Sequence, residues 1–127
     1  MTAVFEELGF WQKRSFSRML EQREVATGEQ LMAQGDMGDE FMILLDGQAA
    51  VTVDGDQVKT VRTGEFFGEL ALLPEISNSD GRRMASVIAT TPATVGVCGP
   101  MIFQHIIDAY PRVGGRIIAQ AWSITGA

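Results

Sequence analysis

The sequence contains 127 residues, 46% of them hydrophobic and 20% charged, which is the size and balance of one folded domain. Ten basic against sixteen acidic residues give a net charge of −6, which disfavours general binding to nucleic acids or anionic membranes. A single histidine and a single cysteine exclude zinc fingers and multi-histidine metal centres, so we expect no metal or cofactor site. We also expect a cytoplasmic protein without a membrane span, because the sequence lacks a secretory signal and a long apolar run.

The middle of the sequence, from Val25 to Val97, consists of short apolar segments separated by closely spaced turn residues such as Asp54-Gly55. Turns at this spacing predict many short antiparallel strands. We expect eight of them, near residues 21–26, 29–34, 40–46, 48–53, 57–62, 65–67, 83–90 and 93–98. The predicted fold class is therefore mainly β: an eight-stranded antiparallel jelly-roll barrel, or double-stranded β-helix, at about 21–98.

Helical patterns flank this barrel. One or two short helices are predicted at about 2–20, and two more at about 100–124, with a break at Pro111. The apolar side of the first C-terminal helix is predicted to hold Met101, Ile102, His105, Ile106 and Ala109. The last helix carries a stripe of Val113, Ile117, Ala121 and Ile124 beside Ile118 and Trp122. We therefore expect one domain over residues 1–127, whose last helix can contact both the barrel and a second copy of the chain.

The residues from Gly68 to Arg83 include the candidates for a ligand-binding site. Gly68 lets the backbone approach a ligand closely, and the Leu-Ala-Leu-Leu run soon after it favours a helical turn whose N–H groups face an anion. Arg83 has the strand parity of small apolar residues at 85, 87 and 89, so it should point inward while Arg82 faces solvent. A buried guanidinium needs an anion, and phosphate fits its fork. Glu69 only accepts hydrogen bonds, which suits a hydroxyl, so the pair predicts a sugar phosphate as the ligand.

Two ordered motifs resemble a known family. The pattern F-G-E-L-A-L-L at 67–73, a spacer, and R-x-A-x-V from Arg83 look like the phosphate-binding cassette of cyclic nucleotide-binding domains, as in catabolite activators and protein kinase A regulatory subunits. The run G-D-M-G-D-E-F-M-I-L-L-D-G at 35–47 is similar to a second motif of that family, and Thr27-Gly28-Glu29 matches its turn before the second strand. The resemblance covers about residues 5–124 and implies the same jelly roll.

The resemblance also implies site residues. Glu69 would bind the ribose 2′-hydroxyl and Arg83 the cyclic phosphate. The implied ligand-binding set is Phe67, Gly68, Glu69, Leu70, Ala71, Arg83, Met84 and Ala85, with the backbone N–H groups of Leu70, Ala71 and Ala85 around the phosphate. A residue of the last helix commonly caps the base in this family, and the candidates by position are Trp122, Ile118 and Arg116.

The sequence departs from the family at two points. Met84 stands where the family usually has Ser, Thr or Ala, and it removes a hydroxyl that often accompanies guanine selectivity. We therefore expect cAMP to be preferred to cGMP. The spacer from Pro74 to Arg82 is longer than the family's compact version, which leaves affinity open.

The function expected from this resemblance is a regulatory sensor module without catalysis. A bound cyclic nucleotide would move the C-terminal helix, and an effector protein or domain would respond to that movement. Two alternatives remain open. In one, Glu69 and Arg83 pair with each other in a domain that no longer binds ligand and serves as an assembly or dimerisation scaffold. The other is a jelly-roll enzyme of the cupin type, which the lone histidine disfavours.

Overall fold

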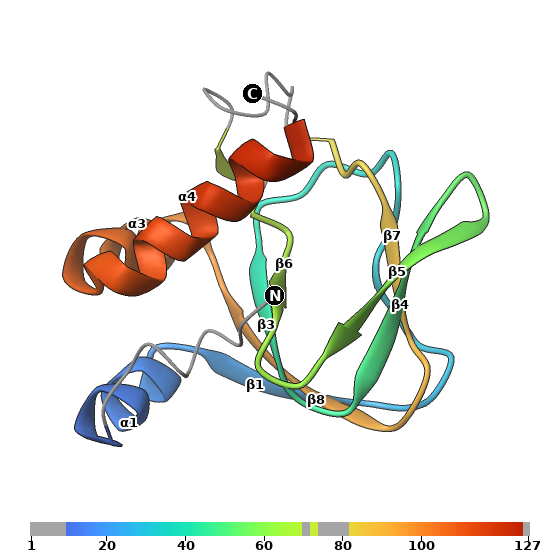
Figure 1. Cartoon of the computed structure of the whole chain (residues 1–127). Helices are drawn as coiled ribbons and strands as arrows, with labels where there is room; N and C mark the ends of the chain where they lie inside the picture. Colours follow the sequence, from blue (N-terminus) through green and yellow to red (C-terminus); the bar gives the residue numbers. More distant parts are fainter. Residues whose placement is uncertain (1–9, 70–71, 74–81, 126–127) are drawn as a thin grey trace.

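Two antiparallel sheets face each other in the computed structural model, and helices cover the outer side of one of them (Figure 1). The structure describes residues 10–69, 72–73 and 82–125, with side chains from residue 14 to residue 120 within those ranges. The helices are α1 (Phe10–Arg18), α3 (Pro100–Ala109) and α4 (Pro111–Thr125). The strands are β1 (Glu21–Val25), β2 (Gln30–Met32), β3 (Phe41–Asp46), β4 (Gln48–Val53), β5 (Asp56–Arg62), β6 (Phe66–Phe67), β7 (Ser86–Ala89) and β8 (Ala93–Cys98).

The strand order is β1-β8-β3-β6 in one sheet and β2-β7-β4-β5 in the other. All pairings are antiparallel, and the chain crosses repeatedly between the two sheets as it proceeds. This arrangement confirms the predicted eight-stranded jelly roll. The Asp54-Gly55 turn was also predicted correctly: it joins β4 to β5, and both residues have positive φ angles of 53° and 87°, as a two-residue hairpin of type I′ requires.

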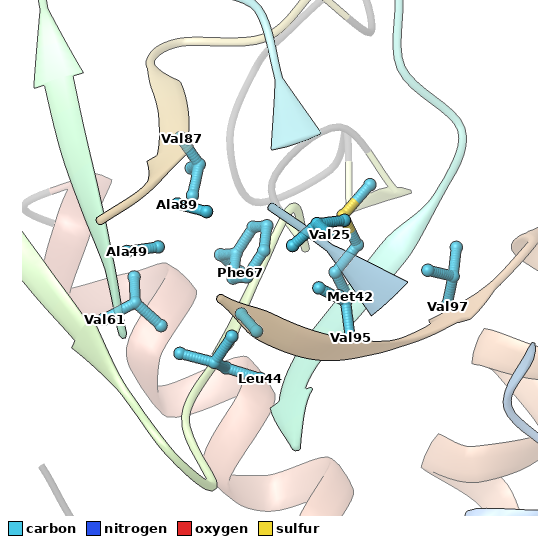
Figure 2. Close-up of a cluster of buried hydrophobic side chains, with 11 residues drawn as sticks. Val25, Met42, Leu44, Ala49, Val61, Phe67, Val87, Ala89, Val95 and Val97 are labelled. Carbon is cyan, nitrogen blue, oxygen red and sulfur yellow. The ribbon is translucent and has the colours of Figure 1, made fainter. Parts of the chain in front are cut away.

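Side-chain alternation along β3 and β6 divides the core in two. Met42 and Leu44 point between the sheets, together with Phe67 of β6. The cluster there comprises Val25, Met42, Leu44, Ala49, Val61, Phe67, Val87, Ala89, Ala93, Val95 and Val97. Figure 2 shows the Phe67 ring in the middle of this cluster. Phe67 therefore belongs to the core next to the site, and it fixes the point at which the chain leaves β6.

The other side of the same strands carries the helices. Phe41, Ile43 and Phe66 pack against apolar side chains of all three described helices. The helix residues in this second cluster are Phe16, Phe103, Ile106, Val113 and Ile117. Val113 and Ile117 lie on the stripe predicted for the last helix. This packing holds α4 against the barrel along its first half.

The apolar side predicted for the first C-terminal helix is correct at Ile106 and wrong at its other four residues. In α3, Phe103 and Ile106 are buried, whereas Met101 is 87% exposed and Ile102 and His105 are also exposed. The reason is the Phe103 ring, which packs 5.0 Å from the Phe41 ring and turns that side of the helix toward the sheet. The predicted helix at about 2–20 is described only as α1, because residues 1–9 lie outside the described part. In the described residues no helix is long and apolar enough to span a membrane.

Candidate functional site

A cavity of about 340 Å³ opens between the β4–β5 hairpin, the residues after β6, the residues before β7, and α4. This volume falls within the range of small-molecule sites. The residues that line it are Met32, Val51, Val53, Val58, Lys59, Val61, Phe66, Phe67, Gly68, Glu69, Arg82, Arg83, Met84, Ala85, Val87 and Gln120. Most are apolar, and the polar side chains come from the residues after β6, from β5, from the residues before β7 and from α4. Such a cavity suits a small ligand with an apolar part and a polar part.

Gly68 makes the sharp turn that follows β6. Its φ angle is +87°, a region that glycine adopts readily and other residues rarely do. A Cβ at this position would lie 2.8 Å from the carbonyl oxygen of Glu40 and 3.1 Å from Nη1 of Arg83. Gly68 therefore provides both the turn and the space that Arg83 occupies.

Arg83 is buried at the wall of this cavity, with 8% of its surface exposed. Its Nη1 donates to the carbonyl oxygen of Gly68 at 3.1 Å, and its Nη2 donates to that of Glu40 at 2.9 Å. A Cβ on Gly38 would collide with the same guanidinium, so two backbone segments, residues 38–40 and the turn at Gly68, enclose it. Burial lowers the pKa of Arg83, and the carboxylates of Glu40, Asp39 and Glu69 oppose that effect. Backbone carbonyl dipoles and the charges of nearby carboxylates thus stabilise the buried positive charge of Arg83. The guanidinium has five N–H donors, more than these two hydrogen bonds use, so it can also donate to an anion.

Arg83 points inward as predicted, but the predicted reason is wrong. Strand β7 begins at Ser86, and Met84 and Ala85 form a bend before it. Arg83 is held by the preceding loop, because its N–H donates to Asp36 at 2.7 Å and its carbonyl accepts from Gly35 at 2.9 Å. Strand alternation therefore does not orient this side chain; a backbone pairing with the 35–36 loop does.

Glu69 is buried more deeply, with 3% of its surface exposed. Its Oε1 accepts a hydrogen bond from Nε2 of Gln120 on α4 at 3.0 Å. Burial raises the pKa of Glu69, and the Gln120 hydrogen bond and the charges of Lys59 and Arg83 oppose that rise. Glu69 and Arg83 do not pair with each other, since the hydrogen bonds of the Arg83 side chain go to the two carbonyls. The cavity thus presents a cation and a carboxylate as separate groups.

Comparison with known proteins decides the family. Residues 22–110 match the family described as cyclic nucleotide-binding domain. The chain belongs to this family. The cAMP-dependent protein kinase regulatory subunit of Hypocrea atroviridis is 36% identical over 104 residues, which make up 82% of this chain and 21% of that protein. The corresponding subunit of Mycosarcoma maydis is 40% identical over 123 residues, with 84% of this chain and 23% of that protein covered.

A solved structure shows the same fold. The structure "cAMP bound PfPKA-R (141-441)" superposes with a TM-score of 0.76 at 24% identity, covering 97% of this chain and 42% of that one. The jelly roll and the family resemblance predicted from the sequence are both confirmed. The chain spans between a fifth and a quarter of the length of the two regulatory subunits. Their names describe regulatory subunits, which agrees with the expectation of a binding domain without catalysis.

The predicted site residues of this cyclic nucleotide-binding domain fall into three groups. Phe67, Gly68, Glu69, Arg83, Met84 and Ala85 all line the cavity. Leu70, Ala71 and most of the long spacer lie outside the described residues, although the Leu72 N–H donates to the Glu69 carbonyl at 3.0 Å. Of the base-cap candidates, Ile118 and Arg116 are half-buried on α4 and are not among the described residues that line the cavity. The Trp122 side chain lies outside the described residues.

Sequence reasoning missed Gln120. This residue follows Ile117 by three positions and Val113 by seven, so it lies on the side of α4 that faces the barrel. The sequence could have indicated Gln120, because it is a polar residue at a position of the helix where the periodicity predicts an apolar one. Within the described part of the chain, no cluster of His, Cys, Asp and Glu could hold a metal ion.

Proposed function

We propose that this domain binds a cyclic nucleotide, with cAMP preferred to cGMP, and converts binding into a change in the position of α4. The observation that carries the proposal is the buried Arg83 fork at the wall of a 340 Å³ cavity that also contains a buried carboxylate. A cyclic phosphate would satisfy the guanidinium with charge-assisted hydrogen bonds. The ribose 2′-hydroxyl would donate to Glu69, and the apolar wall of valines from β4 and β5 would cover the base.

The preference for cAMP has two supports. Met84 lines the cavity without a hydroxyl, at the position where the family usually has a small or hydroxylated residue. The relatives in Hypocrea atroviridis and Mycosarcoma maydis are named as subunits of cAMP-dependent kinases. We also propose an effector that responds to α4, either another protein or domain or a second copy of this chain, and a cytoplasmic location. A helix shift requires that the ligand bind two positions of α4 with different affinities.

The test is isothermal titration of the purified protein with cAMP, cGMP, cCMP and cUMP. We expect saturable binding of one cAMP per chain and weaker binding of cGMP. Arg83→Lys should keep a positive charge but lose the planar fork, and we expect cAMP affinity to fall roughly 10- to 100-fold. Arg62→Lys, on the exposed part of β5, is the matched control and should bind cAMP like the wild type. Absence of binding at millimolar concentrations of all four nucleotides would disprove the proposal and favour a scaffold.

A further inference from the structure

The side chain of Gln120 joins α4 to the buried carboxylate of Glu69, although the two residues are 51 positions apart in the sequence. Both residues line the cavity. Figure 1 shows the C-terminal half of α4 passing near the segment that leads into β7, and the cavity-lining Arg82 and Arg83 belong to the residues before that strand. Among the described residues of α4, Gln120 is the one that reaches the cavity. The helix therefore contacts the site through this amide.

Glu69 can bind a ligand while its carboxylate is hydrogen-bonded to Gln120. An ionised carboxylate accepts about four hydrogen bonds on its two oxygens, and Gln120 takes one of them at Oε1. Arg83 does not orient this carboxylate, because its guanidinium donates to the carbonyls of Gly68 and Glu40. Gln120 is thus the described side chain that fixes the direction of the Glu69 oxygens. A hydroxyl donor arriving from the cavity would meet a carboxylate that Gln120 already holds in place.

The same hydrogen bond also favours the charged form of Glu69. Burial raises the pKa of this carboxyl, and the Gln120 hydrogen bond is the largest effect that lowers it, ahead of the backbone N–H of Glu69 and the charge of Lys59. A protonated carboxyl loses acceptor capacity and becomes a donor itself. Loss of the amide would therefore affect both the direction and the charge of the group that receives the ribose hydroxyl.

We propose that Gln120 is a positioning residue for ribose recognition: its amide holds the Glu69 carboxylate so that the carboxylate accepts the 2′-hydroxyl of a cyclic ribonucleotide. This inference rests on the proposed function, because it assumes that a cyclic nucleotide occupies the cavity. Discrimination between ribose and deoxyribose would then depend on a residue of α4, outside the barrel.

The experiment is a comparison of cAMP and 2′-deoxy-cAMP by isothermal titration. For the wild type we expect cAMP to bind roughly 10- to 100-fold more tightly, the effect of one hydrogen bond to a charged acceptor. Gln120→Met keeps the side-chain length and the helix propensity but removes the donor. We expect this variant to lose most of its cAMP affinity advantage while its affinity for 2′-deoxy-cAMP changes less than about twofold. Gln120→Lys, which restores an N–H donor, should recover part of the advantage.

The control is Gln104→Met on α3, where an exposed glutamine amide also donates to a carboxylate, Asp108 Oδ1, at 3.1 Å. This variant should keep the wild-type ratio of the two affinities. If Gln120→Met fails to fold, Gln120→Asn carries the same prediction, because its shorter side chain does not reach Glu69. A wild-type ratio in Gln120→Met or Gln120→Asn, or an equal loss for both ligands, would overturn the inference while cAMP binding itself stands. A wild type that binds neither ligand would overturn the proposed function as well.

Discussion

Glu69 and Arg83 are the charged side chains that the fold buries among the described residues, and their surroundings differ. Arg83 has two backbone carbonyls in contact, which compensate part of the cost of burying its charge. Glu69 has the Gln120 amide and its own backbone N–H as hydrogen-bond donors and is 3% exposed, and burial still raises its pKa, so its ionised form is incompletely compensated. A residue that destabilises the ligand-free fold in this way is typical of a binding site rather than of a scaffold.

Glu69→Gln should therefore separate stability from binding. The raised pKa means that the folded protein holds this proton more tightly than the unfolded chain, so the contribution of Glu69 to stability is most favourable at low pH. It falls as the pH rises from the ordinary carboxyl pKa to the raised one. The variant lacks this one contribution, and we expect it to unfold at higher urea concentration than the wild type at pH 7. Its cAMP affinity should fall roughly tenfold, because a neutral amide is a weaker acceptor than a carboxylate.

Urea unfolding at pH 4, 5, 6 and 7 and titration with cAMP at pH 7 check both parts. Glu24→Gln, on the exposed part of β1, is the control and should change neither quantity. Glu69→Gln less stable than the wild type at pH 7 would contradict the assignment of Glu69 as an incompletely compensated buried charge.

The residues of the site were predictable to the extent that they are local. Gly68 and Glu69 follow a short strand and precede a turn, and both features are visible in ten residues of sequence. The inward direction of Arg83 was predicted from strand alternation, but it depends on backbone hydrogen bonds to Gly35 and Asp36, far away in the sequence. The Gln120 contact spans 51 residues, and its partner depends on where α4 crosses the barrel. The spacing of apolar residues in the helix does not show which barrel residue Gln120 contacts.

At the level of elements, turn residues located the strands well, whereas helix orientation was harder. All eight strands lie where turn spacing predicted them, with β7 shorter at its start because the chain bends at Met84. In α3, several apolar residues compete for the buried side, and the spacing alone allows more than one choice. The ring of Phe103 determines which side of α3 is buried, because it packs against the ring of Phe41. Ile106, one turn later, is buried on the same side. Contacts with the sheet, which the helix sequence does not show, selected that side.

This packing predicts a large difference between two substitutions in α3. Phe103→Ala removes a buried ring and leaves a cavity beside Phe41, so we expect a loss of about 3–5 kcal/mol in the free energy of unfolding. Met101→Ala removes a side chain that is 87% exposed and should change that free energy by less than about 0.5 kcal/mol. Urea unfolding of the two ligand-free variants measures both values. Similar losses in the two variants would contradict the orientation of α3.

Over the whole molecule, the helices share one sheet but differ in their relation to the cavity. The side chains of α1 and α4 both pack on the outer side of the β1-β8-β3-β6 sheet. Among the described residues, α4 lines the cavity through Gln120, whereas α1 does not line it. In the proposed function the barrel would provide the groups that bind phosphate and ribose, and α4 would be the helix that responds to occupancy of the cavity.

Hydrogen exchange can test whether a ligand acts on the whole fold or on α4 in particular. At a cAMP concentration about 100 times its dissociation constant, linkage stabilises the folded state by about 2.7 kcal/mol. Amides that exchange through global unfolding, as expected in β3 and β8, should then exchange roughly 100-fold more slowly. If α4 responds to the ligand, its amides should also gain protection against local opening, while those of α1 should not. Equal protection of α1 and α4 would show that binding stabilises the fold without selecting a position of the helix, and the sensor proposal would then fail even though the site binds cAMP.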